Sequence, residues 1–136
     1  MKILMLTPYL PFPLLSGGQI RTYNLLKKLA NKHEVTLFSL IKDNNEKKYI
    51  PELEKYCKNV KVFKRSSKPF TMKNVFKTAF SSYPFLVIRN HAPQIISAVE
   101  DELKREKYDL IHAETFYMMP HIPKTSIPTI LVEQTI

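Results

Sequence analysis

Residues 2–40 read KILMLTPYLPFPLLSGGQIRTYNLLKKLANKHEVTLFSL, and this stretch decides the fold. Residues 2–7 form a short, nearly continuous apolar run, which is typical of a strand buried on both faces of a parallel sheet. After a proline-rich loop, residues 19–32 carry apolar side chains at helical spacing. Residues 34–40 are again rich in β-forming residues. This strand–helix–strand unit predicts an α/β protein.

The remaining sequence continues the alternation of strands and helices. We expect further helices at residues 46–57 and 94–107, and further strands at residues 60–63, 109–112 and 128–133. The stretch 68–89 is less regular, and we expect a short helix at residues 72–80 before a break at Pro84. The chain therefore predicts a Rossmann-like, doubly wound and mainly parallel sheet, with helices on both faces and the strand order 3-2-1-4-5.

The length of the chain bounds its domain organisation. A sequence of 136 residues is long enough for one domain of ordinary size but not for two. It ends directly after residues 128–133, a strand that we expect to be buried. A helix usually follows and covers such a strand. We therefore expect residues 1–136 to be a single N-terminal domain of a longer protein.

The composition excludes several classes of protein and site. The single cysteine, Cys57, cannot form an internal disulfide, which excludes disulfide-rich scaffolds and multi-cysteine metal sites. No apolar run reaches the roughly 20 residues that cross a bilayer, and the N-terminus lacks the cleavage site of a signal peptide. His33, His91 and His121 show no ligand-like spacing with carboxylates. We expect a cytoplasmic protein that needs no metal ion or cofactor.

The net charge of +9 is concentrated in the middle of the sequence. Residues 55–99 carry nine basic side chains and no acidic ones, with phenylalanine and tyrosine mixed among them. This combination suits lipid headgroups or nucleic-acid phosphates, and a solvated basic face is an equal alternative. Nucleic acid is disfavoured because no known binding motif accompanies the charge. The candidate membrane-facing residues are Lys61, Lys64, Arg65, Lys68 and Lys73.

Two distant segments are predicted to face one crevice. Doubly wound sheets bind ligands at the carboxyl ends of their strands, where the strand order reverses. In the order 3-2-1-4-5 this reversal lies between the first and fourth strands. Residues 8–18 and 113–119 leave these two strands and should therefore lie at the same edge of the sheet.

The first of these segments ends in the only two glycines of the chain, Gly17 and Gly18. Glycine lets a ligand approach the backbone closely, and the free N–H groups of a helix N-terminus suit a phosphate. Arg21 lies within the same helical turn and could add a charge-assisted contact. In the alternative interpretation, Ser16 caps the helix and the two glycines merely make the turn.

The second segment reads HAETFY at residues 112–117. If the strand continues, His112 and Glu114 point to the same face, because side chains alternate along a strand. An imidazole or a carboxylate at this position could bind sugar hydroxyls or transfer a proton. In the alternative interpretation, His112 is a hydrogen-bonded residue at the end of the strand and Glu114 accepts hydrogen bonds like a helix cap.

The motifs in these segments resemble those of a known family. The strand at residues 2–7 is followed by GGxxRxY at residues 17–23 and by HEVTL at residues 33–37, and residues 108–114 read YDLIHAE. Together they resemble the N-terminal domain of family-4 retaining glycosyltransferases, which have the two-domain GT-B architecture. The resemblance covers nearly the whole chain and is weakest at residues 68–89.

This resemblance implies a division of roles between two Rossmann-like domains. The N-terminal domain of the family mainly receives the acceptor, whereas the C-terminal domain holds most of the nucleotide sugar and carries a paired-glutamate motif. The Gly-Gly loop of the N-terminal domain approaches the donor diphosphate. The resemblance therefore implies that Gly17 and Gly18 bind the diphosphate, with Arg21 nearby and without a metal ion.

The resemblance also bears on the second segment. Many relatives carry an Asp-x-x-His-x-His motif, which Asp109 and His112 match, whereas Glu114 stands in place of the second histidine. His112 and Glu114 are the candidate catalytic residues. The candidate acceptor-binding residues are Glu114, Thr115 and Tyr117.

The sequence thus leads to one expected function and two alternatives. We expect the acceptor-side half of a hexosyltransferase, which passes a sugar from a nucleotide-diphosphate donor to a glycan or lipid-linked acceptor with retention. We expect this half to be inactive without the C-terminal domain, and to dock on the inner face of a membrane. The alternatives are a non-enzymatic module that binds an anionic membrane or nucleic acid through residues 55–89, and a nucleotide-binding regulatory domain.

Overall fold

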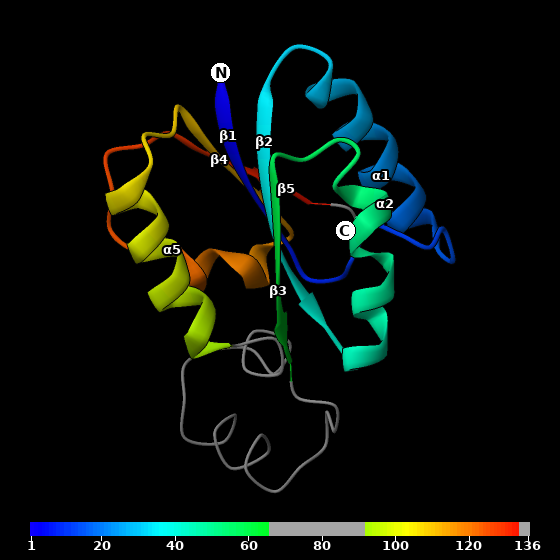
Figure 1. The fold of residues 1–136 in the computed structure, drawn as a ribbon. Helices are drawn as coiled ribbons and strands as arrows, with labels where there is room; N and C mark the ends of the chain where they lie inside the picture. The colour runs from blue at the N-terminus through cyan, green and yellow to red at the C-terminus, as the bar shows by residue number, and fades with distance from the viewer. Residues whose placement is uncertain (66–91, 134–136) are drawn as a thin grey trace, which may run out of the picture.

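The computed structural model of the chain describes residues 1–65 and 92–133, which form one parallel sheet covered by helices (Figure 1). The strands are β1 (Lys2–Thr7), β2 (Glu34–Ile41), β3 (Asn59–Lys64), β4 (Leu110–Glu114) and β5 (Thr129–Val132). Their order is β3-β2-β1-β4-β5, and every neighbouring pair is parallel. The predicted fold class and strand order are therefore confirmed, and the order reverses between β1 and β4.

Helices cover both faces of the sheet. On one face lies α1 (Gly17–Ala30), together with the 3-10 helix η1 (Asn44–Tyr49) and the short α2 (Ile50–Leu53). The other face is covered by α5 (Pro93–Arg105), which Figure 1 shows on the opposite side of the strands. A second 3-10 helix, η2 (Phe116–His121), follows β4.

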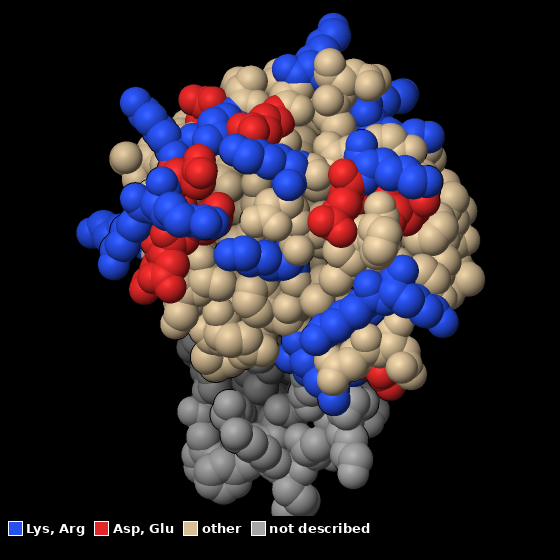
Figure 2. Space-filling view, in the orientation of Figure 1, with Lys and Arg blue, Asp and Glu red and all other residues tan. Residues whose placement is uncertain are grey.

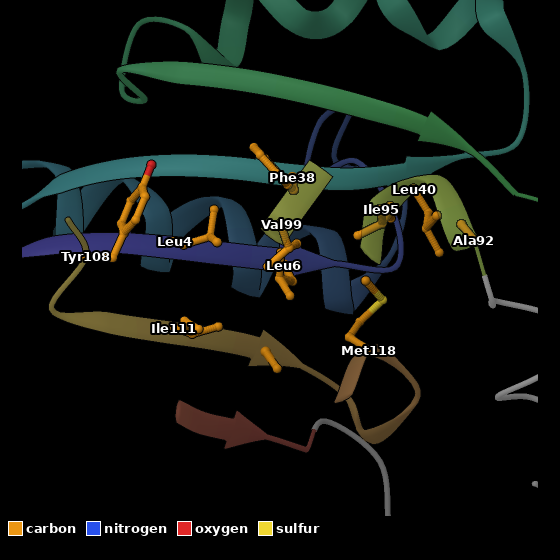
Figure 3. Packing of buried hydrophobic residues seen from close by; sticks show 11 residues of the cluster. Leu4, Leu6, Phe38, Leu40, Ala92, Ile95, Val99, Tyr108, Ile111 and Met118 are labelled. Carbon is orange, nitrogen blue, oxygen red and sulfur yellow. The ribbon is translucent and has the colours of Figure 1, made fainter. Parts of the chain in front are cut away.

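Alternate residues of β1 supply the two hydrophobic cores. Ile3 and Met5 face α1 and α2, whereas Leu4 and Leu6 face α5, where they pack with residues such as Val99 (Figure 3). All four β1 side chains are almost completely buried, which explains the continuous apolar run in the sequence. The apolar stripe of each helix therefore has a sheet face on which to pack.

Two predicted element boundaries are wrong. The single helix expected at residues 46–57 is replaced by η1 and α2, because Asp43 and Glu46 form a capping box that starts a helix early. Pro51 then occupies the first turn of α2, where its missing N–H interrupts no hydrogen bond. The fourth strand also continues past residue 112, because Ala113 pairs with both neighbouring strands.

The expectation that the fifth strand is buried is also wrong for the described structure. Ile130 and Leu131 are 48% and 45% exposed. They lie on β5, which pairs only with β4 among the described residues and is therefore an edge strand. The short helix expected at residues 72–80 lies outside the described residues. No helix in the described ranges is long and apolar enough to cross a bilayer.

The contrast between neighbouring leucines of α1 tests this packing. Leu26 is completely buried, whereas Leu25 is only partly buried. Leu26→Ala should lower the free energy of unfolding by about 2–5 kcal/mol, because it leaves a cavity under the helix. Leu25→Ala makes the same change in helix propensity as Leu26→Ala, and it should lower the free energy of unfolding by less than about 1 kcal/mol. Urea denaturation of both variants measures the difference, and equal losses would contradict the described packing.

Candidate functional site

A hydrogen-bonded cluster joins the two segments that were predicted to share a crevice. Arg21, in the first turns of α1, reaches Glu114 at the end of β4, and its Nη1 lies 3.2 Å from Glu114 Oε2. These residues are 93 positions apart in the sequence. Because β1 and β4 are parallel neighbours, residues 8–18 and 113–119 leave the same edge of the sheet, as predicted, and the contact between Arg21 and Glu114 lies at this edge.

Glu114 is the centre of this cluster. Its side chain is completely buried, and one carboxylate oxygen lies 2.7 Å from His112 Nε2. The same oxygen is 3.3 Å from Arg21 Nη1. His112 and Glu114 are two positions apart on β4, so their side chains point to the same face of the sheet, the one covered by α1. The expected extended backbone is confirmed.

The cluster fixes the chemical state of its members. A buried carboxylate stays ionised only when a countercharge and hydrogen bonds replace its water. Arg21 supplies the countercharge, and its side chain is 44% exposed, so it separates Glu114 from solvent. An ionised Glu114 can only accept, so the contact with His112 is a hydrogen bond that Nε2 donates to Glu114 Oε1.

The two glycines belong to the first turn of α1. Ser16 caps the helix by accepting a hydrogen bond from the Gln19 N–H at 3.2 Å, as one alternative expected. Neither Gly17 nor Gly18 has a positive φ, so the turn itself does not require glycine. A Cβ atom at Gly17 would meet nothing within 4 Å. Gly17 therefore faces open space in the first turn of α1, where backbone N–H groups lack acceptors within the helix.

Thr115 has a strained backbone directly after β4. Its φ of 69° and ψ of 152° lie in a region that residues other than glycine rarely adopt. Its N–H donates to the Val132 carbonyl at 2.7 Å, which holds the strained residue in position. Such strain concentrates at functional sites, where the surrounding structure maintains it.

Two buried hydroxyls in this region lack hydrogen-bond partners. Among the described residues, the oxygens concerned are Thr7 Oγ1 and Thr115 Oγ1, at the carboxyl ends of β1 and β4. Thr7 was not predicted as a site residue. The available signal was a polar residue that ends an otherwise apolar strand at the point where the strand order reverses.

The predicted membrane-facing residues do not share one face of the sheet. Lys61 pairs with Phe38, and its Nζ lies 5.6 Å from the centre of that ring. Lys64 instead pairs with Ile41, which belongs to the core on the opposite face. Side chains three positions apart on a strand point in opposite directions, so these two lysines cannot contact one flat surface in the same way.

Other predicted site residues contribute less. Lys68, Lys73 and the side chain of Tyr117 lie outside the described structure. No group of three or more potential metal ligands occurs within residues 1–65 and 92–133. Burial raises the pKa of the Cys57 thiol to about 12, so this cysteine is not a nucleophile.

No family model, curated protein or solved structure matches this chain. The inference of function therefore rests on the motifs and on the geometry of the cluster.

The dependence of Glu114 on its countercharge is testable by a double-mutant cycle. Arg21→Ala leaves the buried carboxylate without its cation and should lower the free energy of unfolding by about 2–3 kcal/mol. In a Glu114→Gln background the same change should cost less than about 1 kcal/mol, because the neutral amide needs no countercharge. Urea denaturation of the four proteins at neutral pH measures the coupling. Equal costs in both backgrounds would show that the ion pair contributes nothing.

Replacing Thr115 separates backbone strain from the loss of its hydroxyl. Thr115→Gly and Thr115→Ala both remove the hydroxyl, but only glycine relieves the unfavourable φ. We expect the glycine variant to be more stable than the alanine variant by about 1 kcal/mol, after allowing for the greater flexibility of unfolded glycine. Their urea midpoints provide the measurement, and an alanine variant of equal or higher stability would contradict the strain.

Proposed function

We propose that this chain is the acceptor-side half of a retaining glycosyltransferase of GT-B architecture. Such an enzyme would move a sugar from a nucleotide-diphosphate donor to a glycan or lipid-linked acceptor. The strongest support is the meeting of two motifs from distant parts of the sequence. The open first turn of α1 lies beside the Arg21–Glu114–His112 cluster, where the strand order reverses.

The start of α1 would stabilise the departing diphosphate. Breaking the bond between sugar and phosphate leaves negative charge on the diphosphate, and a helix N-terminus stabilises an anion without a metal ion. The open space over Gly17 would let the phosphate oxygens reach the backbone N–H groups. Arg21 has five N–H donors and contacts Glu114 through Nη1, so its remaining donors would be available to the same phosphate.

The end of β4 would position the acceptor. The imidazole of His112 is oriented by Glu114, whose Oε1 lies 2.7 Å from His112 Nε2, and it would help to hold the acceptor. The strained backbone of Thr115 would help to fix the end of β4 beside this imidazole. Because Glu114 is completely buried, it would act by holding Arg21 and His112 rather than by touching the acceptor.

The proposal assigns the rest of the donor site to a second domain. This chain alone would not transfer sugar, because the resemblance implies that most nucleotide contacts come from the C-terminal half. The proposal includes docking on an anionic membrane, where a lipid-linked acceptor would be found. Lys61 and Lys64 point to opposite faces of β3, which gives little support to the alternative of a non-enzymatic module that binds an anionic surface through this strand.

Gly17→Ala distinguishes a functional glycine from a structural one. The added methyl meets no protein atom, and alanine favours helix over glycine, so stability should stay equal or rise by up to about 1 kcal/mol. If the diphosphate rests on this turn, the methyl should lower sugar transfer by the complete protein about tenfold or more. Turnover is measured with nucleotide-sugar donors, and Lys28→Ala, which changes an exposed position further along α1, is the control.

Two results would defeat the proposed function. One is a complete protein that neither hydrolyses nor transfers any nucleotide sugar in a broad donor screen. The other is a Gly17→Ala variant with unchanged turnover, since the open turn would then not contact the leaving group.

A further inference from the structure

A hollow lined in part by polar side chains lies beside the start of α1, on the side away from β4. It has a volume of about 460 Å³ and opens between the loop after β1 and η1, at the carboxyl ends of β1, β2 and β3. Its polar walls are formed by Tyr9, Ser16, Gln19, Lys42, Glu46 and Arg65. None of the three residues of the Arg21–Glu114–His112 cluster lines it, so it is a separate site at the same edge of the sheet.

Two cationic side chains and one acidic side chain line the hollow. Glu46 is its one acidic lining residue, and its carboxylate accepts hydrogen bonds from the backbone N–H groups of Lys42 and Asp43 at 2.6 and 3.1 Å. The acidic charge is therefore used to start η1. The two cationic lining residues, Lys42 and Arg65, come from the segments directly after β2 and β3.

The opposite wall of the hollow is braced. The Gln19 amide donates to the Leu10 carbonyl at 3.1 Å, and Ser16 Oγ donates to Gln19 Oε1 at 3.2 Å. The Tyr9 hydroxyl is 3.2 Å from Thr22 Oγ1 on α1. Because these contacts fix the loop against the helix, the wall is preorganised for a ligand rather than formed by one.

Further basic side chains occur on the elements that border the hollow. Lys47 and Lys48 on η1 and Lys64 at the end of β3 are exposed. Figure 2 shows Lys and Arg side chains gathered over η1 and the lower ends of β2 and β3, whereas basic and acidic side chains are mixed over the upper part of this face. A local excess of positive charge raises the concentration of anions near the entrance.

We propose that this hollow binds an acceptor sugar that carries an anionic group, either a phosphate or a carboxylate. The volume falls within the range of small-molecule sites, and it accommodates one charged monosaccharide unit. Arg65 would form paired hydrogen bonds with the anion, and Lys42 would add a point charge. The inference rests on the proposed function and specifies the acceptor: its charged part would lie in this hollow.

Binding of charged and neutral sugars to this 136-residue chain tests the inference without a donor. The probes are glucose 6-phosphate, glucuronate, glucose and inorganic phosphate, titrated by NMR. We expect the two charged sugars to bind at least tenfold more tightly than glucose and than inorganic phosphate, and to weaken as salt is added. Lys42→Gln and Arg65→Gln should each weaken the charged sugars about tenfold, since each removes a charge-assisted contact. Lys32→Gln changes the same charge outside the hollow and should bind normally.

Several results would overturn the inference. Glucose or inorganic phosphate could bind as tightly as glucose 6-phosphate, or the folded chain could bind neither charged sugar. Lys42→Gln and Lys32→Gln could also weaken the binding of the charged sugars equally. Sugar transfer by the complete protein is scored separately. Transfer without probe binding would overturn this inference alone, whereas probe binding without transfer would overturn the proposed function and keep the anion site.

Discussion

The carboxylate of Glu114 imposes the constraint on which the rest of the site depends. It lies completely buried at the end of an interior strand, where an ionised group needs a countercharge. The nearest cation is Arg21, which comes from a helix more than ninety residues earlier in the chain. Their pairing ties the start of α1 to the end of β4. The orientation of the open glycine turn relative to His112 is therefore set by one buried charge rather than by the loop that precedes the helix.

Polar residues on the α1 face of the sheet are concentrated at the carboxyl ends of the strands. Along β1, Ile3 and Met5 enter the hydrophobic core and Thr7 ends the strand with an unpartnered hydroxyl. Along β4, His112 and Glu114 replace the apolar residues that packing alone would favour. Each unpartnered hydroxyl, and the strained backbone of Thr115, costs about 1–3 kcal/mol. The hydrophobic cores on the two faces of the sheet offset these costs.

Most of the fold could be predicted from the sequence, because the alternation of apolar strands and amphipathic helices leaves one reasonable sheet order. The errors arose where local signals competed with tertiary pairing. Residues 113 and 114 lack the β-branched and aromatic side chains typical of strands, yet Ala113 pairs with β1 and β5 and Glu114 pairs with β5, so β4 extends to Glu114. The sequence could predict that the segments near Arg21 and Glu114 lie at the same edge of the sheet. It could not predict the ion pair between them, because no spacing rule links residues so far apart in the chain. The φ of Thr115 has no sequence signal, whereas the opposed directions of Lys61 and Lys64 follow from strand periodicity alone.

Arg21 has consequences for how the two halves of the proposed reaction communicate. Its guanidinium faces a buried carboxylate on one side and solvent on the other, so a diphosphate at the start of α1 would share a cation with Glu114. Two anions drawing on one guanidinium weaken its hold on each, and His112 becomes the group that compensates Glu114. Because Arg21 and His112 hold the same carboxylate, a phosphate that draws on Arg21 would also change how firmly Glu114 orients the imidazole. In the proposed reaction, this link would couple the binding of the donor diphosphate to the position of His112 at the end of β4.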